Sequence, residues 1–130
     1  MKIILGSSSP SRKKLLKNTG IDFKVKSPTI NETAQKKEFK GKKKDLAIYL
    51  AEKKALSIHA ESEDIIIGAD QVLLHNNKIY DKPRSIQDAK KHLKELSNKT
   101  HSLISGTVIS KKNKIIWRHQ SVSKMKMRKL

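Results

Sequence analysis

Hydrophobic and polar positions follow two periodicities along the 130-residue chain, and the switches between them predict alternating strands and helices. Short apolar or alternating runs indicate strands, whereas apolar residues three and four positions apart indicate helices. The expected elements, in chain order, are a strand at 2–5, a helix at 9–18, a strand at 21–25, a helix at 45–58, strand segments at 65–67 and 72–74, a helix within 83–96, a hairpin of 103–110 and 114–117, and a final strand at 121–130. This order predicts a mixed α/β domain.

Three details of the pattern are specific enough to compare with a structure. Leu15 and Leu16 are the apolar residues of the first helix, and we expect both to face the core. Residues 27–44 are polar and rich in lysine, with a proline and a glycine as breakers, and predict a loop or a mobile segment. Residues 68–71 interrupt an apolar run and indicate a polar break in the buried strand.

The composition narrows the class of protein. A length of 130 residues favours a single domain over 1–130. Hydrophobic residues make up 35% and aromatic residues only 4%, so the core must be aliphatic. The lack of cysteine excludes a disulfide framework, a thiolate metal site and a cysteine nucleophile. No apolar run approaches a membrane span and no signal-peptide pattern is present, so we expect a cytoplasmic location without a membrane partner.

The charge balance points to an anionic partner. The chain has 30 Lys and Arg residues against 12 Asp and Glu residues, which gives a formal net charge of +18. Nucleic acid, an anionic surface or an anionic small substrate would each suit such a chain. The basic residues are mostly lysines spread along the whole sequence, and aromatic residues for base stacking are few. This distribution does not favour nucleic acid as the main partner.

Asp70 is the first candidate for chemistry. It lies within an apolar run, where a carboxylate is costly to bury unless it is paired or binds a cation. The small residues Gly68 and Ala69 before it leave room for a ligand to approach. Capping of a turn at the end of a strand is an equally good interpretation from this residue alone.

Two lysines and one carboxylate add weaker signals. Lys82 precedes Pro83, which restricts its backbone, and Lys54 lies beside the apolar face of a helix. Taken alone, each lysine is better interpreted as a charge that extends to water. Glu32 lies in the polar segment and by itself would be an ordinary surface residue.

The turn after the first strand is a candidate anion site. Ser7, Ser8 and Ser9 offer hydroxyl and backbone N–H groups at the start of a helix, where the helix dipole favours negative charge. Arg12 adds a planar guanidinium that suits phosphate oxygens. Capping of the helix by Ser9 alone is the simpler alternative.

The order of these segments resembles the Maf family of nucleoside triphosphate pyrophosphatases, also described as septum-formation-inhibitor-like proteins. The resemblance covers all 130 residues, and Ser105-Gly106 stands where the family often has Thr-Gly. The segments that carry it are Ser7-Ser8-Ser9-Pro10-Ser11-Arg12, Ile30-Asn31-Glu32, Lys54-Ala55, Gly68-Ala69-Asp70, Lys82-Pro83 and Leu96-Ser97-Asn98-Lys99-Thr100-His101.

The resemblance implies a fold and a reaction. The fold is α/β, a mixed and strongly twisted sheet flanked by helices, of the Maf/ITPase-like kind. The reaction is hydrolysis of a nucleoside triphosphate to the monophosphate and pyrophosphate, with attack of water between the α- and β-phosphates. Asp70, Lys82 and Glu32 are the implied catalytic residues, and Asp70 and Glu32 would also hold a Mg²⁺ or Mn²⁺ ion. The implied substrate-binding residues are Ser7, Ser8, Ser9, Arg12, Lys54 and Gln71. Because members commonly pair, a homodimer is expected.

This sequence departs from the family pattern in three places. Ser11 replaces the first arginine of an Arg-Arg pair, so Arg12 acts alone. Gln71 stands where many members have Thr, which resembles the branch linked to modified purines such as 7-methyl-GTP. A later Lys-Ala-Gly-x-Tyr-x-Ile-Gln-Gly-like segment is absent, so we expect a C-terminally truncated domain. A truncated, non-catalytic nucleotide- or nucleic-acid-binding protein is the alternative function, and metal-dependent release of pyrophosphate separates the two.

Overall fold

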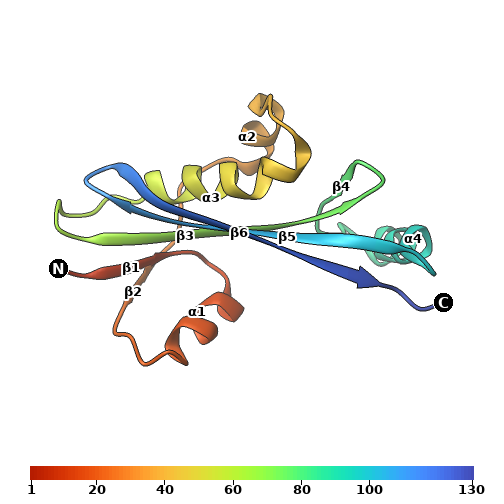
Figure 1. Cartoon of the computed structure of the whole chain (residues 1–130), viewed down its shortest axis with the longest axis horizontal. Coiled ribbons are helices and arrows are strands. Elements are labelled where there is room, and N and C mark those ends of the chain that lie inside the picture. The colour runs from red at the N-terminus through yellow and green to blue at the C-terminus, as the bar shows by residue number, and fades with distance from the viewer.

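One mixed sheet of six strands organises the computed structural model, which describes all 130 residues (Figure 1). The strands are β1 (Ile3–Gly6), β2 (Lys24–Lys26), β3 (Ile65–His75), β4 (Lys78–Tyr80), β5 (Thr100–Lys111) and β6 (Lys114–Lys126). Their order is β2-β1-β3-β5-β6, and β4 pairs with β3. β1 runs parallel to β2 and β3, whereas β4 and β5 are antiparallel to β3, and β6 is antiparallel to β5. The expected α/β class with a mixed, twisted sheet is therefore confirmed.

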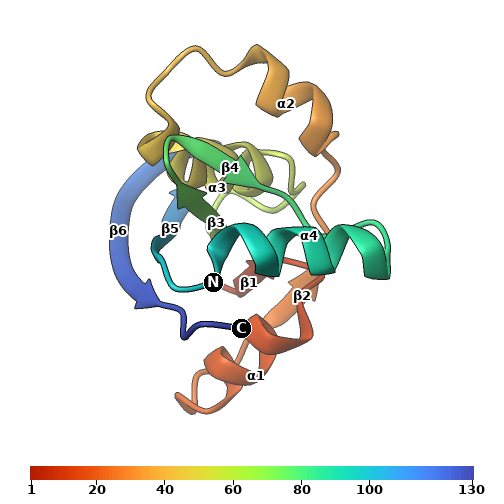
Figure 2. The same cartoon turned by 90° about the vertical axis from the view of Figure 1, so that its right-hand side faces the viewer.

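Helices cover both faces and one end of this sheet. They are α1 (Pro10–Lys17), α2 (Glu32–Glu38), α3 (Leu46–Leu56) and α4 (Ile86–Leu96), and a short 3-10 turn at Lys43–Asp45 precedes α3. α1 lies on one side of the sheet, and α2 and α3 lie on the other (Figure 1). α4 lies at the end of the molecule where β4 is found (Figure 2). No helix of the structure has the length and the apolar character needed to cross a membrane.

The core lies between α3 and the sheet. Ala51 and Ala55 are fully buried against an aliphatic cluster from β1, β3 and β5, as the low aromatic content predicts. Gly68 and Gly106 make this close packing possible. A Cβ atom added at Gly68 would lie 2.5 Å from the backbone oxygen of Ala51, and one at Gly106 would lie 2.7 Å from the backbone nitrogen of Ile48. The backbone of α3 therefore lies directly on the two central strands.

The structure corrects four expectations about local structure. Residues 27–44 contain helix α2, because Asn31 caps it by accepting the backbone N–H of Ala34 at 3.1 Å. Residues 68–71 do not break a strand, since β3 continues through them with alternating burial. β6 is likewise one strand where two were expected. In α1, Leu15 is 68% exposed, because no element packs against that face of the helix.

Candidate active site

The connections of β1 place a crevice at its carboxyl end. The chain leaves β1 through α1 to reach β2, and it returns through α3 to reach β3 on the other side of β1. Because α1 and α3 lie on opposite faces, the strand order reverses between β1 and β3 (Figure 1). In open α/β sheets ligands bind outside the carboxyl ends of the strands at such a switch point. Gly6 of β1 pairs with Gly68 of β3 at this switch point. The serine turn comes directly after Gly6, and Asp70 comes two residues after Gly68, so both lie at the carboxyl end of β1.

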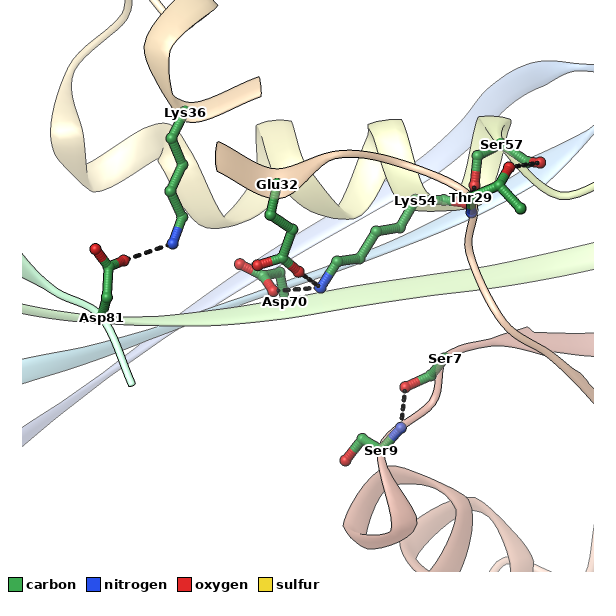
Figure 3. A network of polar contacts seen from close by, with 9 residues as sticks. All are labelled: Ser7, Ser9, Thr29, Glu32, Lys36, Lys54, Ser57, Asp70 and Asp81. Atoms are coloured by element: carbon green, nitrogen blue, oxygen red, sulfur yellow. Dashed lines mark hydrogen bonds and ion pairs between the residues drawn. The ribbon is translucent and has the colours of Figure 1, made fainter. Parts of the chain in front are cut away.

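Lys54, Glu32 and Asp70 form the ion-pair cluster at this switch point. The ammonium Nζ of Lys54 lies 2.7 Å from Oδ1 of Asp70 and 2.6 Å from Oε1 of Glu32. Figure 3 shows the lysine extending from α3 between a carboxylate of α2 and one of β3. The Lys54 and Asp70 side chains are only 10% and 11% exposed, whereas the Glu32 side chain is 46% exposed. One buried cation thus connects three elements that are distant in sequence.

Local structure explains why these side chains meet. Asp70 points to the face of β3 that α3 covers, because it is two residues from Gly68 in a strand of period two. The contact of α3 with Gly68 brings the last turn of the helix, with Lys54, over this face. Glu32 is the first residue of α2, directly after its cap at Asn31. The packing of two helices on one strand therefore assembles the cluster.

The cluster fixes the charge states of its members. Burial on its own would lower the pKa of Lys54, but its hydrogen bonds to Asp70 and Glu32 and their charges raise that pKa above the ordinary value. Partial burial would raise the pKa of Glu32, but the hydrogen bond and charge of Lys54 bring that pKa below the ordinary value. The charges of Lys36 and Lys82 act in the same direction. Around neutral pH the ammonium of Lys54 and the carboxylate of Glu32 are both charged.

A second ion pair, between Lys36 and Asp81, holds the segment that contains Lys82 near the cluster. Lys36 of α2 contacts Asp81 at 2.6 Å, and Asp81 directly precedes Lys82 in the loop after β4 (Figure 3). Lys82 is exposed, and its charge contributes to the lowered pKa of Glu32. The structure therefore brings together Glu32, Lys54, Asp70 and Lys82.

The serine turn lies at the exit of β1. Ser9 caps α1 by accepting the backbone N–H of Arg12 at 3.3 Å, so the capping interpretation of Ser9 is confirmed. The hydroxyl of Ser7 is buried and accepts the backbone N–H of Ser9 at 3.0 Å. Ser8 is exposed between them. Figure 3 shows Ser7 and Ser9 apart from the ion-pair cluster, without a contact between the two groups.

Two further residues expected to bind substrate, Gln71 and Arg12, also lie outside the cluster. Gln71 is exposed and follows Asp70 in β3, so it points to the opposite face of the sheet. Arg12 lies in the first turn of α1, on the side of the sheet away from α3 (Figure 1). The Arg12 side chain forms no ion pair with any carboxylate. Its proposed contact with phosphate stays a prediction.

The donor set of the cluster suits a hard divalent cation. Lys54 bonds one oxygen of each carboxylate, which leaves the second oxygens of Asp70 and Glu32 without a hydrogen bond. Mg²⁺ commonly binds through one or two carboxylates together with the phosphates of its substrate. No group of three or more His, Cys, Asp or Glu side chains gathers anywhere in the structure. The residues therefore fit a metal that is held jointly with substrate, and they do not form a closed protein site.

Sequence reasoning missed the residues that hold α2 in place. Besides the pair of Lys36 and Asp81, the hydroxyl of Tyr49 donates to Oε1 of Gln35 at 3.0 Å. Asn31 followed by the acidic Glu32 is a helix-start signal that could have revealed α2. The partners Asp81 and Tyr49 have no such signal, because their contacts depend on tertiary packing.

These features define an α/β protein with paired carboxylates and cations at the switch point of its sheet. The family model described as "Maf-like protein" matches residues 2–130. The chain belongs to this family of nucleoside triphosphate pyrophosphatases.

Named relatives share the family but differ in their substrates. The chain is 38% identical to "7-methyl-GTP pyrophosphatase" of Brucella abortus biovar 1 (strain 9-941) over all of its own length and 67% of that protein. It is 41% identical to "dTTP/UTP pyrophosphatase" of Thermosipho melanesiensis (strain DSM 12029 / CIP 104789 / BI429), over 89% of this chain and 60% of the relative. The chain thus spans about two thirds of the length of the curated relatives it matches.

A solved structure shows the same fold at low sequence identity. The "Structure of a HAM1 protein from Coxiella burnetii" aligns with a TM-score of 0.61 and 14% identity, over 97% of this chain and 72% of that one. This likeness confirms the expected Maf/ITPase-like sheet.

Proposed function

We propose that this protein hydrolyses a nucleoside triphosphate to the monophosphate and pyrophosphate, with the ion-pair cluster as its catalytic centre. The observation that carries the proposal is the buried Lys54, which holds Glu32 and Asp70 together at the switch point of the sheet. Family membership supports the same reaction class.

The cations around the cluster would bind the triphosphate. A triphosphate carries about four negative charges, which must be neutralised before water can attack. Lys54 and Lys82 would contact phosphate oxygens from the side of the cluster, and Arg12 would contact them from α1. The free hydroxyl of Ser8 and the N-terminus of α1 would add hydrogen-bond donors.

The carboxylates would activate the water. Its oxygen attacks phosphorus at the bridge between the α- and β-phosphates, the bridging P–O bond breaks, and pyrophosphate leaves. Asp70 would orient the water and accept its proton, and the ionised Glu32 would assist. Asp70 and Glu32 would also hold a Mg²⁺ or Mn²⁺ ion, which supplies further charge neutralisation at the phosphates.

We propose a modified purine such as 7-methyl-GTP as the preferred substrate. The Asp70-Gln71 pair and the relative from Brucella support this preference. Gln71 is exposed on the face that α3 leaves free, where a base would have room to lie. A homodimer and a cytoplasmic location stay predictions from the family resemblance.

The test compares two Asp→Asn variants across a panel of canonical and methylated nucleoside triphosphates, with and without Mg²⁺ or Mn²⁺. Asp70→Asn removes the carboxylate of the cluster, and Asp22→Asn makes the same change at an exposed residue outside every ion pair. We expect Asp70→Asn to lower the rate of pyrophosphate release at least about 100-fold. We expect Asp22→Asn to match the wild type, and circular dichroism checks that both variants are folded.

Full activity in Asp70→Asn would contradict the assignment of the centre. Binding of nucleotides or nucleic acid that weakens steeply with salt, without any pyrophosphate release by the folded wild type, would instead support a non-catalytic binding protein.

A further inference from the structure

The ion-pair cluster has no excess of positive charge for phosphates. Its single cation, Lys54, is matched by the carboxylates of Glu32 and Asp70, so the three side chains together carry one negative charge. Lys82, in the loop after β4, only brings this sum to zero. A triphosphate carries about four negative charges that must be neutralised. The proposed function, on which this inference rests, therefore requires a further cation beside the cluster.

Lys36 of α2 is placed to supply this cation. It lies four residues after Glu32, and residues four apart share one face of a helix, with Cβ atoms about 6 Å from each other. Figure 3 shows both side chains leaving α2 on the same side. The charge of Lys36 contributes to the lowered pKa of Glu32, so its field is felt at the cluster. Phosphates bound at the cluster therefore lie within reach of Lys36.

The partner of Lys36 in the free protein can be exchanged easily. The Lys36 ammonium lies 2.6 Å from Oδ1 of Asp81, and the two side chains are 30% and 60% exposed. The pair of Lys54 and Asp70, in contrast, is almost completely buried. Exposed ion pairs contribute little to stability, because water screens them and both side chains must be ordered. An anion with more charge than a carboxylate can therefore displace Asp81 at a small cost.

The loop that carries Asp81 has other anchors besides this ion pair. Asp81 directly follows Tyr80, the last residue of β4, which pairs with β3. Three residues after Asp81, the backbone N–H of Arg84 donates to Oδ2 of Asp88 in α4 at 3.0 Å. A strand and a helix thus hold the loop at its two ends. Lys36 can leave Asp81 without releasing the loop.

These observations assign a role to both partners of the pair. We propose that Lys36 is a further phosphate-binding residue of this site, which exchanges Asp81 for the phosphates of the substrate. A phosphate carries more negative charge than a carboxylate and accepts charge-assisted hydrogen bonds on three oxygens. The exchange supplies the missing cation, and it leaves Asp81 in water, where its side chain is already more than half exposed. Asp81 thereby competes with the substrate for one lysine.

This competition predicts opposite effects of the two partners on affinity. The probe is inorganic tripolyphosphate with Mg²⁺, and isothermal titration calorimetry measures its dissociation constant. Lys36→Met removes the cation, so we expect the dissociation constant to rise about tenfold. Asp81→Asn removes the competitor, so we expect the dissociation constant to fall about threefold. Circular dichroism checks that both variants are folded.

Matched variants separate the exchange from the general charge of the protein. Lys37→Met and Asp22→Asn make the same two changes at exposed residues that form no ion pair, and we expect both to match the wild type within about twofold. A double-mutant cycle adds a second control. In the Lys36→Met background, Asp81→Asn should no longer tighten binding, because its effect acts through the lysine.

The binding measurement separates this proposal from the proposed reaction. If the wild type releases no pyrophosphate, the proposed function fails, but the opposite shifts in affinity would still assign Lys36 to a phosphate site. Weakening by both Lys36→Met and Asp81→Asn would make the pair a structural contact and overturn the exchange. Unchanged binding in folded Lys36→Met, tightening by Asp81→Asn that persists without Lys36, or no binding of tripolyphosphate by the wild type would also overturn it.

Discussion

Helices α3 (Leu46–Leu56) and α1 (Pro10–Lys17) both border the proposed site, but they are held in different ways. α3 buries six of its residues against the sheet, and its Lys54 is fixed by two carboxylates. α1 buries none of its residues and begins with a serine cap and Pro10. The comparison teaches that the ion-pair cluster is preformed by the packing of α3 on the sheet, whereas α1 is held beside the sheet without a buried side chain.

The largest expected effect comes from removing the cation of the cluster. Lys54→Met leaves the buried carboxylate of Asp70 without its partner, and we expect the free energy of unfolding to fall by about 3 kcal/mol. Lys53→Met is the matched control on the same helix, because Lys53 is exposed, lies over the ring of Tyr49 and forms no ion pair with a carboxylate. Urea unfolding measures both. Equal stability of the two variants would show that the cluster is not a preformed part of the fold.

A methyl group between α3 and the sheet is expected to have the next largest effect. Gly68→Ala would place its Cβ 2.5 Å from the backbone oxygen of Ala51, so α3 must shift, at a cost of about 2 kcal/mol. At Gly6 the nearest atom to such a Cβ is a side-chain carbon of Ile58 at 3.0 Å, which can give way more easily. Thermal unfolding should therefore give Gly68→Ala a clearly lower melting temperature than Gly6→Ala. The reverse order would contradict the packing described for α3.

Removal of the α1 cap should lower the stability of that helix alone. Ser9→Ala removes the acceptor for the backbone N–H of Arg12, which costs the helix about 1 kcal/mol. We expect faster hydrogen exchange in the amides of α1 and unchanged exchange in α3. If both helices respond equally, then α1 is coupled to the core more tightly than its exposure indicates.

The smallest expected effect is a pH dependence from Glu32. Its pKa in the folded protein lies below the ordinary value of 4.5, so its ion pair stabilises the fold above that pH and is lost as the pH falls through the lowered pKa. Glu32→Gln lacks this contribution, so its stability deficit of less than about 1 kcal/mol should disappear in acid. The raised pKa of Lys54 adds no pH dependence in this range, because its contribution to stability is fully present below pH 10.5 and is lost only as the pH rises through the raised value. Unfolding followed as a function of pH measures the difference, and a deficit that grows in acid would contradict the sign.

Periodicity predicted most of the fold because the strands and α3 follow strong apolar patterns. Ser85 directly precedes α4 and caps it, because its hydroxyl accepts the backbone N–H of Asp88 at 3.0 Å. The sequence pattern did not predict α2, because six of its seven residues are polar and the helix buries no side chain. Leu15 was assigned to the core wrongly, since periodicity identifies an apolar face but not whether another element covers it.

The site was predictable as a set of residues but not as a geometry. The family resemblance selected Lys54 and Asp70. They are 16 positions apart in the sequence, and no local sequence pattern indicated that they would form a pair. Their contact depends on how closely α3 approaches Gly68, which is a property of the packed molecule. The same strand alternation that buries Asp70 turns Gln71 to the opposite face, so neighbours in the motif are separated in space.

The most direct test of the central claim is to identify the reaction products by phosphorus NMR, with a nucleoside triphosphate, Mg²⁺ and the purified 130-residue chain. The account predicts a nucleoside monophosphate and pyrophosphate from the wild type, and neither product from folded Asp70→Asn. A nucleoside diphosphate with orthophosphate, or the same products from both proteins, would contradict it.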